Sequence, residues 1–343
     1  KIYLYIMIDK TLLIFFFLLS SFLAFLIQKI FIKYRKFDDF NHRTSHKTLA
    51  TKTGGISIFC CLFLITFIYY FKGEELFDFS ILIPLSIMFI VGVYDDFYEA
   101  DFKLKFLLQI IVAKIIIDQG YVIDSFQGIF GIYELPWVFA QLFTTFVFLV
   151  IVNAYNFIDG IDGLASSVGI FVFLSIFLIN LLFGQFSTIG MVSLLIILSC
   201  SAFLVFNFPP ARVFMGDSGS LFLGYSIIIL FFETIQLNLI DIWTWLILLS
   251  FILGETTTTS ILRIFITKKW YGAHRSHAYQ NLARILDSHG YVLLAILSYH
   301  ILWLLPLALL SIQYHHYKVL FFSFAIIPVI FLNLIYGPKF SSK

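Results

Sequence analysis

Long apolar runs alternate with short polar segments along almost the whole chain. A helix needs about 17–25 apolar residues to cross the hydrocarbon core of a bilayer. Runs of roughly this kind lie near residues 11–32, 54–71, 80–94, 105–118, 136–153, 164–183, 188–206, 219–236, 242–263, 291–311 and 318–336. The run at 105–118 is the weakest, because it is short and contains Lys114. The pattern predicts an all-α polytopic membrane bundle of about 10–11 transmembrane helices, formed by one domain that covers residues 1–343.

The composition favours a membrane protein and excludes other classes. The chain is 61% hydrophobic and only 12% charged, whereas a soluble domain carries about 25% charged residues. The net charge is +2, and no basic tract of the kind that binds nucleic acid is present. Cys60, Cys61 and Cys200 all lie inside apolar runs, which is typical of small buried side chains and not of a disulfide framework.

Lysine and arginine are unevenly distributed between alternate loops. Loops 33–53 and 264–290 are rich in them, while the loops on the other side carry Glu74, Glu75 and Asp124. Because basic loops stay in the cytoplasm, we expect the N-terminus outside and the C-terminus in the cytoplasm. The polar clusters described next then all lie at the cytoplasmic face. Carboxylates beside a bilayer are costly unless they face water, a metal or a partner, so we expect these clusters to form one site.

Two adjacent carboxylates, Asp95 and Asp96, follow the run at 80–94. Successive residues of a helix point about 100° apart, so one carboxylate can face a site while the other binds a neighbouring segment. Taken alone, such a pair is more typical of the solvated start of a loop. The other interpretation is metal binding or proton abstraction, helped by Lys103 or Lys105 further along the chain.

The segment that follows the run at 136–153 is more specific. Amides and carboxylates recur there at every third position, at Asn153, Asn156, Asp159 and Asp162. On one helix these side chains would fan over half of the circumference, whereas Gly160 and Gly163 favour a bend that lets them converge. Two amides and two carboxylates suit a hard cation or a hydroxyl-rich sugar. Helix capping explains one of these residues but not all of them.

A third cluster surrounds Asp217 in the segment MGDSGS at 215–220. Its glycines free the backbone, and Ser218 or Ser220 can cap the helix that follows. The N-terminus of that helix would favour a bound phosphate, and Asp217 could hold a Mg²⁺ ion that bridges it. An ordinary turn between two spans explains this segment equally well when it is considered alone.

Histidines gather in the polar loop that reads HRSHAYQ at 274–280. His274 and His277 are three residues apart and would share one face of a helix. The cysteine and spacing patterns of a zinc site are absent. Arg275 and the imidazole donors suit a diphosphate better.

Two further features depend on partners that lie elsewhere in the chain. Glu255 is a carboxylate inside an apolar run, and Arg263 or a cation in the site are candidates for its partner. The basic loop before Gly54 contains Lys47. Positive-inside topology and attraction to anionic lipid are the first interpretation of this loop, and substrate binding is the second.

Together these motifs resemble the polyprenyl-phosphate N-acetylhexosamine-1-phosphate transferase superfamily. The resemblance covers nearly the whole chain, because the family's motifs occur in the family's order: a basic loop with Gly54-Gly55, then Asp95-Asp96, NAYNFIDGIDGL, VFMGDSGSLFLG and HRSHAYQ. It implies a bundle in the bacterial inner (plasma) membrane with a cytoplasmic active site, and Mg²⁺ as cofactor with Mn²⁺ as a substitute. It also implies a UDP-activated sugar as donor and undecaprenyl phosphate as acceptor.

In such enzymes a phosphate oxygen of the lipid attacks the β-phosphorus of the nucleotide sugar, and UMP leaves. The resemblance matches the family's metal-binding aspartate to Asp217, and Asp95 to the residue that deprotonates or orients the lipid phosphate. A phosphate monoester has a second pKa of about 6, so at neutral pH orientation is the larger task. A covalent intermediate on an aspartate is left open. The predicted catalytic residues are Asp95, Asp96, Asp159, Asp162, His274 and His277, the substrate-binding residues are Lys47, Lys105, Asn153, Asn156 and Arg275, and the metal ligands are Asp217 and Asn156.

The histidine motif departs from the family's commonest pattern. HAYQ is similar to relatives that initiate O-antigen in lipopolysaccharide synthesis, and some of these act on 6-deoxy-HexNAc donors. We therefore expect a HexNAc or 6-deoxy-HexNAc donor, with plain GlcNAc less favoured. Glu255 stands where many relatives have Asp, and the oligomeric state is open. The alternative is a transporter or flippase of lipid-linked sugars, which predicts charges along a path through the bilayer or an internal repeat.

Overall fold

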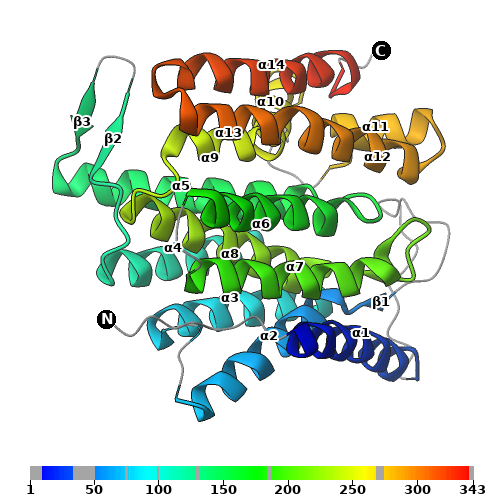
Figure 1. The fold of residues 1–343 in the computed structure, drawn as a ribbon. Coiled ribbons are helices and arrows are strands. Elements are labelled where there is room, and N and C mark those ends of the chain that lie inside the picture. The colour runs from blue at the N-terminus through cyan, green and yellow to red at the C-terminus, as the bar shows by residue number, and fades with distance from the viewer. Residues whose placement is uncertain are drawn as a thin grey trace.

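The computed structural model describes residues 10–33, 51–73, 76, 78–98, 100–128, 131–183, 187–267 and 274–339, and most of these are helical (Figure 1). Nine helices in these ranges are long and apolar enough to cross a membrane. Seven of them are single helices: α1 (Lys10–Lys33), α2 (Gly54–Phe71), α3 (Phe79–Tyr98), α5 (Trp137–Phe157), α6 (Leu164–Phe183), α7 (Thr188–Asn207) and α8 (Gly216–Gln236). The eighth is continuous through α12 (His289–Tyr299), η1 (His300–Leu304) and α13 (Leu305–Gln313), and the ninth combines η2 (His315–Tyr317) with α14 (Lys318–Tyr336).

Two of the predicted spans differ from this set. The apolar run at 242–263 is not one straight span, because α9 (Ile242–Leu248) and α10 (Ser250–Ile266) meet at an angle of 73°. At the break, the hydroxyl of Ser250 donates to the carbonyl of Ile247 over 2.8 Å, so a side chain satisfies a carbonyl at the end of α9. The run at 105–118 forms α4 (Phe102–Asp118), whose 17 residues are at the lower limit for a span.

The remaining elements are short and lie at the two ends of the bundle. β2 (Ser125–Gln127) and β3 (Ile132–Glu134) form an antiparallel hairpin that projects from one end (Figure 1). At the other end β1 (Thr51–Lys52) pairs with β4 (Val213–Phe214) in parallel. The amphipathic helix α11 (Ala278–Ile285) also lies at that other end.

Helix α8 is the centre of the bundle. In the most apolar part of α8, 89% of the residues are buried, compared with 17% for α1 and for α14, which lie at opposite edges of the bundle (Figure 1). α8 packs against α3, α5 and α2. Glycines allow the close approach of these helices: a Cβ at Gly55 of α2 would lie 2.0 Å from the backbone nitrogen of Gly219, and one at Gly92 of α3 would lie 2.4 Å from the carbonyl oxygen of Asp217. The start of α8 is therefore enclosed by other helices.

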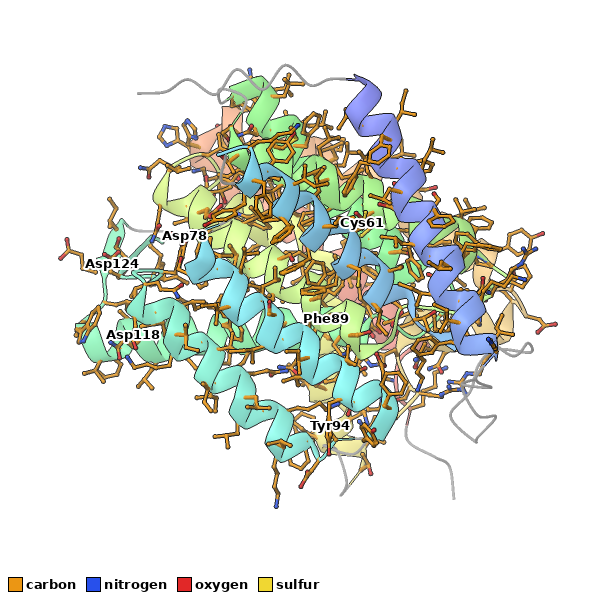
Figure 2. The ribbon with its side chains drawn as sticks, turned by 90° about the horizontal axis from the view of Figure 1, so that it is seen from below. Cys61, Asp78, Phe89, Tyr94, Asp118 and Asp124 are labelled. Carbon is orange, nitrogen blue, oxygen red and sulfur yellow. The ribbon has the colours of Figure 1, made fainter. Side chains whose placement is uncertain are left out.

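The direction of each helix decides which polar residues share an end of the bundle. Figure 2 shows α3 and α4 side by side, with Asp78 and Asp118 at one end and Tyr94 near the other. The Tyr94 end of α3 carries Asp95 and Asp96, and it is the end at which α4 and α8 begin and α5 finishes. The acidic motifs thus meet because α3 and α5 run toward this end of the bundle while α4 and α8 run away from it.

Candidate active site

An ion-pair bridge forms the centre of the acidic cluster. The ammonium nitrogen of Lys105 in α4 lies 3.0 Å from Oδ2 of Asp95 and 3.1 Å from Oδ2 of Asp217. These three side chains remain 17–27% exposed, so solvent reaches them. A cation between two carboxylates offsets their mutual repulsion. The predicted convergence of α3 and α8 on one site is confirmed for these residues.

Asp96 has a different role from its neighbour Asp95. Its two carboxylate oxygens accept hydrogen bonds from the backbone N–H groups of Asp217 and Ser218, over 2.8 and 3.0 Å. These N–H groups belong to the first turn of α8, where intrahelical partners are lacking and a negative charge is favourable. One carboxylate of the pair therefore faces Lys105, while the other binds a neighbouring segment and holds Asp217 in place. This division was expected from the 100° angle between successive helix residues.

Gly216 makes this arrangement sterically feasible. Its φ of +73° lies in the left-handed region, which residues other than glycine rarely adopt. A Cβ at this position would also lie 2.6 Å from Oδ2 of Asp96. The first glycine of the GDSGS motif is thus required both by backbone conformation and by the close approach of a carboxylate.

Asn156 and Asp159 complete the cluster from the end of α5. Nδ2 of Asn156 donates to Oγ of Ser220 over 2.8 Å, and this hydroxyl donates to the carbonyl of Gly216 over 3.1 Å. Asp159 lies in the link between α5 and α6. Burial, followed by the negative charges of Asp217, Asp96 and Asp162, raises the pKa of Asp159 to about 7. Because three other carboxylates contribute to this shift after burial, Asp159 stands among several negative charges, an arrangement that would favour a bound cation.

The donor atoms of this cluster suit Mg²⁺, which prefers carboxylate and carbonyl oxygens. Asp217, Asp159 and the amide oxygen of Asn156 are oxygen donors of this type. In the described part of the chain no group of three or more His, Cys, Asp or Glu side chains is already arranged around a metal position. Lys105 and backbone N–H groups occupy several of the carboxylate oxygens instead. The residues present therefore fit the ion by chemistry, with Lys105 as the neighbouring cation.

Asn153 does not join the acidic cluster. Its amide nitrogen donates to Oε1 of Gln109 over 2.7 Å, and the amide nitrogen of Gln109 donates back to Oδ1 of Asn153 over 3.3 Å. Gln109 is buried in α4, so this reciprocal amide pair joins α4 to α5. α5 stays helical up to Phe157, and the three-residue step to Asn156 turns Asn153 away by about 60°. The expectation that all four polar residues converge is wrong at this position.

Asp162 also binds residues outside the cluster. Its Oδ2 accepts a hydrogen bond from the backbone N–H of Ala211 over 3.0 Å and lies 3.2 Å from Nδ1 of His289. These contacts tie the link between α5 and α6 to the segment after α7 and to the start of α12. His289 lies outside every motif recognised in the sequence. Its position directly after Ser288, which caps α12, is the only local signal that it stands at a helix start.

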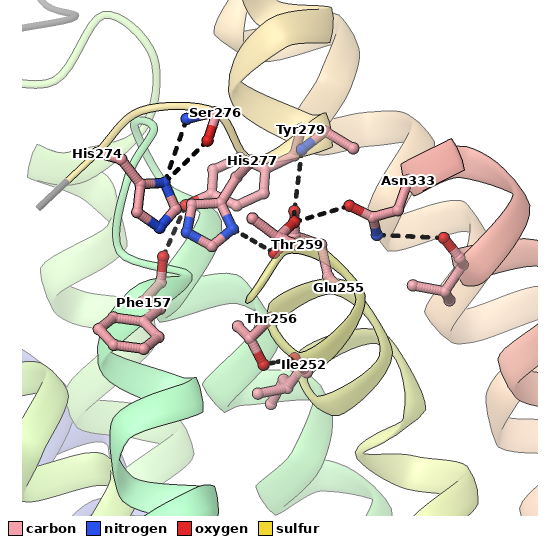
Figure 3. A network of polar contacts seen from close by, with 12 residues as sticks. Phe157, Ile252, Glu255, Thr256, Thr259, His274, Ser276, His277, Tyr279 and Asn333 are labelled. Carbon is pink, nitrogen blue, oxygen red and sulfur yellow. Dashed lines mark hydrogen bonds and ion pairs between the residues drawn. The ribbon is translucent and has the colours of Figure 1, made fainter. Parts of the chain in front are cut away.

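The histidine motif lies against the same link (Figure 3). The rings of His274 and His277 are stacked with their centroids 4.8 Å apart. The hydroxyl of Tyr279 donates to the carbonyl of Phe157 at the end of α5 over 2.8 Å. Gly160 also packs against this hydroxyl, because a Cβ at Gly160 would lie only 2.4 Å from it. The histidine motif therefore contacts the link that carries Asp159.

Glu255 has partners that the sequence did not suggest. Its carboxylate binds His277 and the backbone N–H of Ala278, two residues of the histidine motif. The backbone carbonyl of Arg275 accepts a hydrogen bond from Arg284 over 2.6 Å, which brings a second arginine to the motif. Lys47, which the sequence assigns to substrate binding, lies outside the described residues.

Fold and site together define a multi-pass helical membrane protein whose acidic, amide and histidine motifs meet at one end of the bundle. The family model described as glycosyl transferase family 4 matches residues 78–235 of the chain, from the start of α3 almost to the end of α8. This range contains the acidic motifs but not the histidine loop.

Comparison with curated proteins gives longer matches. A probable undecaprenyl-phosphate N-acetylglucosaminyl 1-phosphate transferase of Bacillus subtilis is 34% identical over 79% of this chain and 76% of its own length. An undecaprenyl-phosphate α-N-acetylglucosaminyl 1-phosphate transferase of Salmonella typhi is 31% identical over 64% of this chain and 61% of its own length. A phospho-N-acetylmuramoyl-pentapeptide-transferase of Caldicellulosiruptor bescii is 32% identical over 57% of the chain and 66% of its own length. The chain belongs to glycosyl transferase family 4 and is an enzyme of its phospho-sugar transferase type.

Proposed function

We propose that this enzyme transfers a HexNAc-1-phosphate or 6-deoxy-HexNAc-1-phosphate group from a UDP-sugar to undecaprenyl phosphate. The observation that carries the proposal is the bridge from Asp95 through Lys105 to Asp217, with Asp159 beside it, at the end of a membrane bundle. Two of the relatives named above, those of Bacillus subtilis and Salmonella typhi, act on undecaprenyl phosphate according to their names, which supports a lipid phosphate as acceptor. The transporter alternative gains no support from these relatives, because they are transferases.

The reaction exchanges one phosphorus–oxygen bond for another. An oxygen of the lipid phosphate forms a bond to the sugar-bearing β-phosphorus of the donor. The bond from that phosphorus to the oxygen shared with the α-phosphate breaks, and this oxygen leaves with its electron pair as part of UMP. The product is a lipid-linked sugar diphosphate. Because both reactants are anions, the enzyme must offset their repulsion and the charge that spreads over the phosphoryl oxygens.

Lys105 and Asp95 are placed to receive the acceptor. The ammonium group of Lys105 can move from its carboxylate partners to a phosphate oxygen, since all three side chains are partly exposed. Asp95, which also accepts a hydrogen bond from the backbone N–H of Ala100 over 2.8 Å, keeps a fixed position while this exchange takes place. Orientation of an already ionised phosphate is therefore its main task.

The donor diphosphate would lie between the Asp159 segment and the histidine motif. His274, His277 and Arg275 supply N–H donors of the kind that bind phosphate oxygens. Asp217, Asp159 and Asn156 would hold the Mg²⁺ ion, which would supply positive charge to the diphosphate when bound. Asp96 and Gly216 would keep Asp217 at the position that this task requires.

The proposal includes a cellular location. β1 and His274, which are described residues at the ends of the two loops rich in lysine and arginine, lie at the end of the bundle that carries the site, and basic loops face the cytoplasm. We therefore place the site at the cytoplasmic face of the bacterial inner membrane. UDP-sugars are cytoplasmic metabolites, so this orientation gives the donor access. The product would start the synthesis of a cell-surface polysaccharide such as O-antigen.

The test is a donor screen with purified protein. Protein in proteoliposomes that contain undecaprenyl phosphate is given Mg²⁺ and, in turn, UDP-GlcNAc, UDP-GalNAc and a UDP-6-deoxy-HexNAc. Release of UMP together with a lipid-linked sugar diphosphate supports the proposal, and the preferred donor identifies the sugar. Absence of UMP release with every donor, alongside movement of preformed lipid-linked sugar across the membrane, contradicts it.

A further inference from the structure

Glu255 in the middle of α10 is a fully buried carboxylate, with 0% of the residue exposed. Buried polar groups cost free energy unless their atoms are hydrogen-bonded. One oxygen, Oε2, lies 2.6 Å from Nδ1 of His277, and the other, Oε1, accepts the backbone N–H of Ala278 over 3.0 Å (Figure 3). Both oxygens are thus satisfied by two consecutive residues of the histidine motif.

The contact with Glu255 determines which nitrogen of His277 carries a hydrogen. With Glu255 ionised, its oxygens only accept hydrogen bonds, and the hydrogen between the two groups then belongs to Nδ1 of the imidazole. Such a bond fixes the tautomer of the ring and its orientation. Nε2, on the other side of the ring, points away from Glu255. Figure 3 shows this side of His277 facing His274 and Phe157.

The free side of His277 lies next to the acidic link. The ring centroids of His277 and Phe157 are 6.4 Å apart. Phe157 is the last residue of α5 and stands two positions before Asp159. Glu255 itself lies behind the imidazole and is shielded from solvent. Any influence of Glu255 on a bound phosphate must therefore pass through the imidazole of His277 or through the backbone at Ala278.

We propose that Glu255 is a positioning residue that holds His277 as the Nδ1–H tautomer and aims its Nε2 at the diphosphate of the sugar donor. This inference rests on the proposed function, because it assumes a diphosphate at the site. His277 is the group that touches the substrate, and Glu255 acts only through it. The arrangement follows the same physical logic as other carboxylate–histidine pairs, in which a buried acid orients an imidazole.

A second layer of contacts keeps Glu255 in place. The hydroxyl of Thr259, one turn further along α10, lies 3.4 Å from Oε1 of Glu255 and 2.9 Å from Oδ1 of Asn333 in α14. Nδ2 of Asn333 in turn donates to the carbonyl of Val329 over 3.2 Å. The single hydroxyl hydrogen of Thr259 serves one of these two oxygens at a time, and the bond to Asn333 joins the part of α10 that carries Glu255 to a second helix of the bundle.

A simpler explanation is that Glu255 only anchors the loop through the N–H of Ala278. Glu255→Gln separates the two roles. The backbone N–H of Ala278 is a fixed donor, so the amide oxygen of the new side chain must face it. The NH₂ group then faces Nδ1 of His277, which has to become an acceptor, and the ring must carry its hydrogen on Nε2. The variant therefore keeps the loop anchor and reverses the tautomer.

The kinetic test compares Glu255→Gln, Glu255→Asp and Glu255→Ala with the wild type in the UMP-release assay. We expect kcat/KM for the nucleotide sugar to fall about 10- to 100-fold in the Gln and Ala variants, as is typical when the carboxylate partner of a functional histidine is removed. The Asp variant, which keeps an acceptor, should recover part of the activity. KM for undecaprenyl phosphate should change little. Thr256→Val is the matched control, because Thr256 is a buried neighbour on α10 whose hydroxyl donates within that helix, to Ile252 over 2.7 Å and to Leu253 over 3.5 Å.

A double-mutant cycle shows whether the effect passes through His277. If it does, Glu255→Ala adds little to the loss already caused by His277→Ala, because residues that act as a unit are not additive. The proposal would be overturned if the losses of kcat/KM in the two single variants multiplied in the double variant. It would also be overturned if kcat/KM of Glu255→Gln stayed within twofold of the wild type. Thermal unfolding in detergent verifies that each variant used is folded.

A readout that needs no activity keeps this inference distinct from the proposed function. Nitrogen NMR on protein with ¹⁵N-labelled histidine reports which ring nitrogen of His277 carries hydrogen. We expect the signal of a protonated Nδ1 in the wild type and of a protonated Nε2 in Glu255→Gln. An inactive wild type would count against the proposed function alone, whereas the same tautomer in both proteins would overturn the role of Glu255.

Discussion

Asp217 and Glu255 are carboxylates at the same end of the bundle, but they are satisfied in different ways. Asp217 is paired with the ammonium of Lys105, and its side chain is 27% exposed. Glu255 is completely buried and bound to an imidazole and a backbone N–H group. A partly exposed ion pair can be exchanged for a ligand at modest cost, whereas removing one partner of a buried pair is costly. The comparison suggests that the acidic cluster binds and releases ligands while the Glu255 network stays fixed.

Asp217→Asn gives the sharpest test of whether the acidic cluster binds ligands. The amide has the same size but lacks the charge that a Mg²⁺ ion requires, so we expect kcat to fall about 10²- to 10³-fold, the loss typical of one missing electrostatic group in a site. UMP release in proteoliposomes measures the effect. Asp118→Asn is the control, because Asp118 pairs with Lys114 on the surface at the far end of α4. Equal rates for Asp217→Asn and the wild type would contradict the proposed site.

Substitution of Lys105 tests whether its ammonium group and a metal ion compete for the same carboxylates. In Lys105→Gln the two acids lose their cation, so we expect kcat to fall about 10-fold or more through weaker stabilisation of phosphoryl charge. The Mg²⁺ concentration that gives half of the maximal rate should fall as well, since more negative charge attracts the ion. Titration of activity with Mg²⁺ measures both quantities. Lys105→Arg keeps the charge, so its kcat and Mg²⁺ requirement should remain closer to those of the wild type. A higher Mg²⁺ concentration for half of the maximal rate in Lys105→Gln would count against this competition.

Gly216→Ala tests how the start of α8 positions Asp217. The positive φ and the contact with Asp96 each oppose a methyl group at this position. We expect the free energy of unfolding to fall by about 1–3 kcal/mol, the usual cost of a strained backbone conformation. Thermal unfolding in detergent provides the measurement. Gly73→Ala is informative beside it, because Gly73 also has a positive φ but a methyl group there would meet no heavy atom within 4 Å. If both variants lose the same stability, the contact with Asp96 contributes nothing.

Asn153→Leu should have the smallest effect on catalysis. The substitution breaks the amide pair with buried Gln109, so we expect a loss of about 1–3 kcal/mol in the free energy of unfolding. KM for the nucleotide sugar should stay within about twofold, because each pair residue contacts the other instead of the acidic cluster. Gln109→Leu combined with Asn153→Leu should regain stability relative to either single variant. A large rise in KM for the nucleotide sugar would return Asn153 to the substrate-binding set.

The sequence was sufficient for features that depend on neighbouring residues. Apolar runs predicted where the helices lie, since the length and hydropathy of a span are local properties. Polar residues at the ends of those runs identified the segments that meet in the site. The 100° step between successive residues also showed that Asp95 and Asp96 would face different partners.

Tertiary structure decided every pairing between distant segments. The spacing of residues in the chain carried no signal for three features: the angle between α9 and α10, the amide pair of Asn153 with Gln109, and the contact of Asp162 with His289. The same holds for Glu255, whose partner His277 comes from a separate loop. A buried polar group must be satisfied by whichever donor the packing of helices brings within reach, and this choice depends on the whole bundle. Local sequence therefore determined which residues are polar and where the helices lie, and packing determined which of those residues act together.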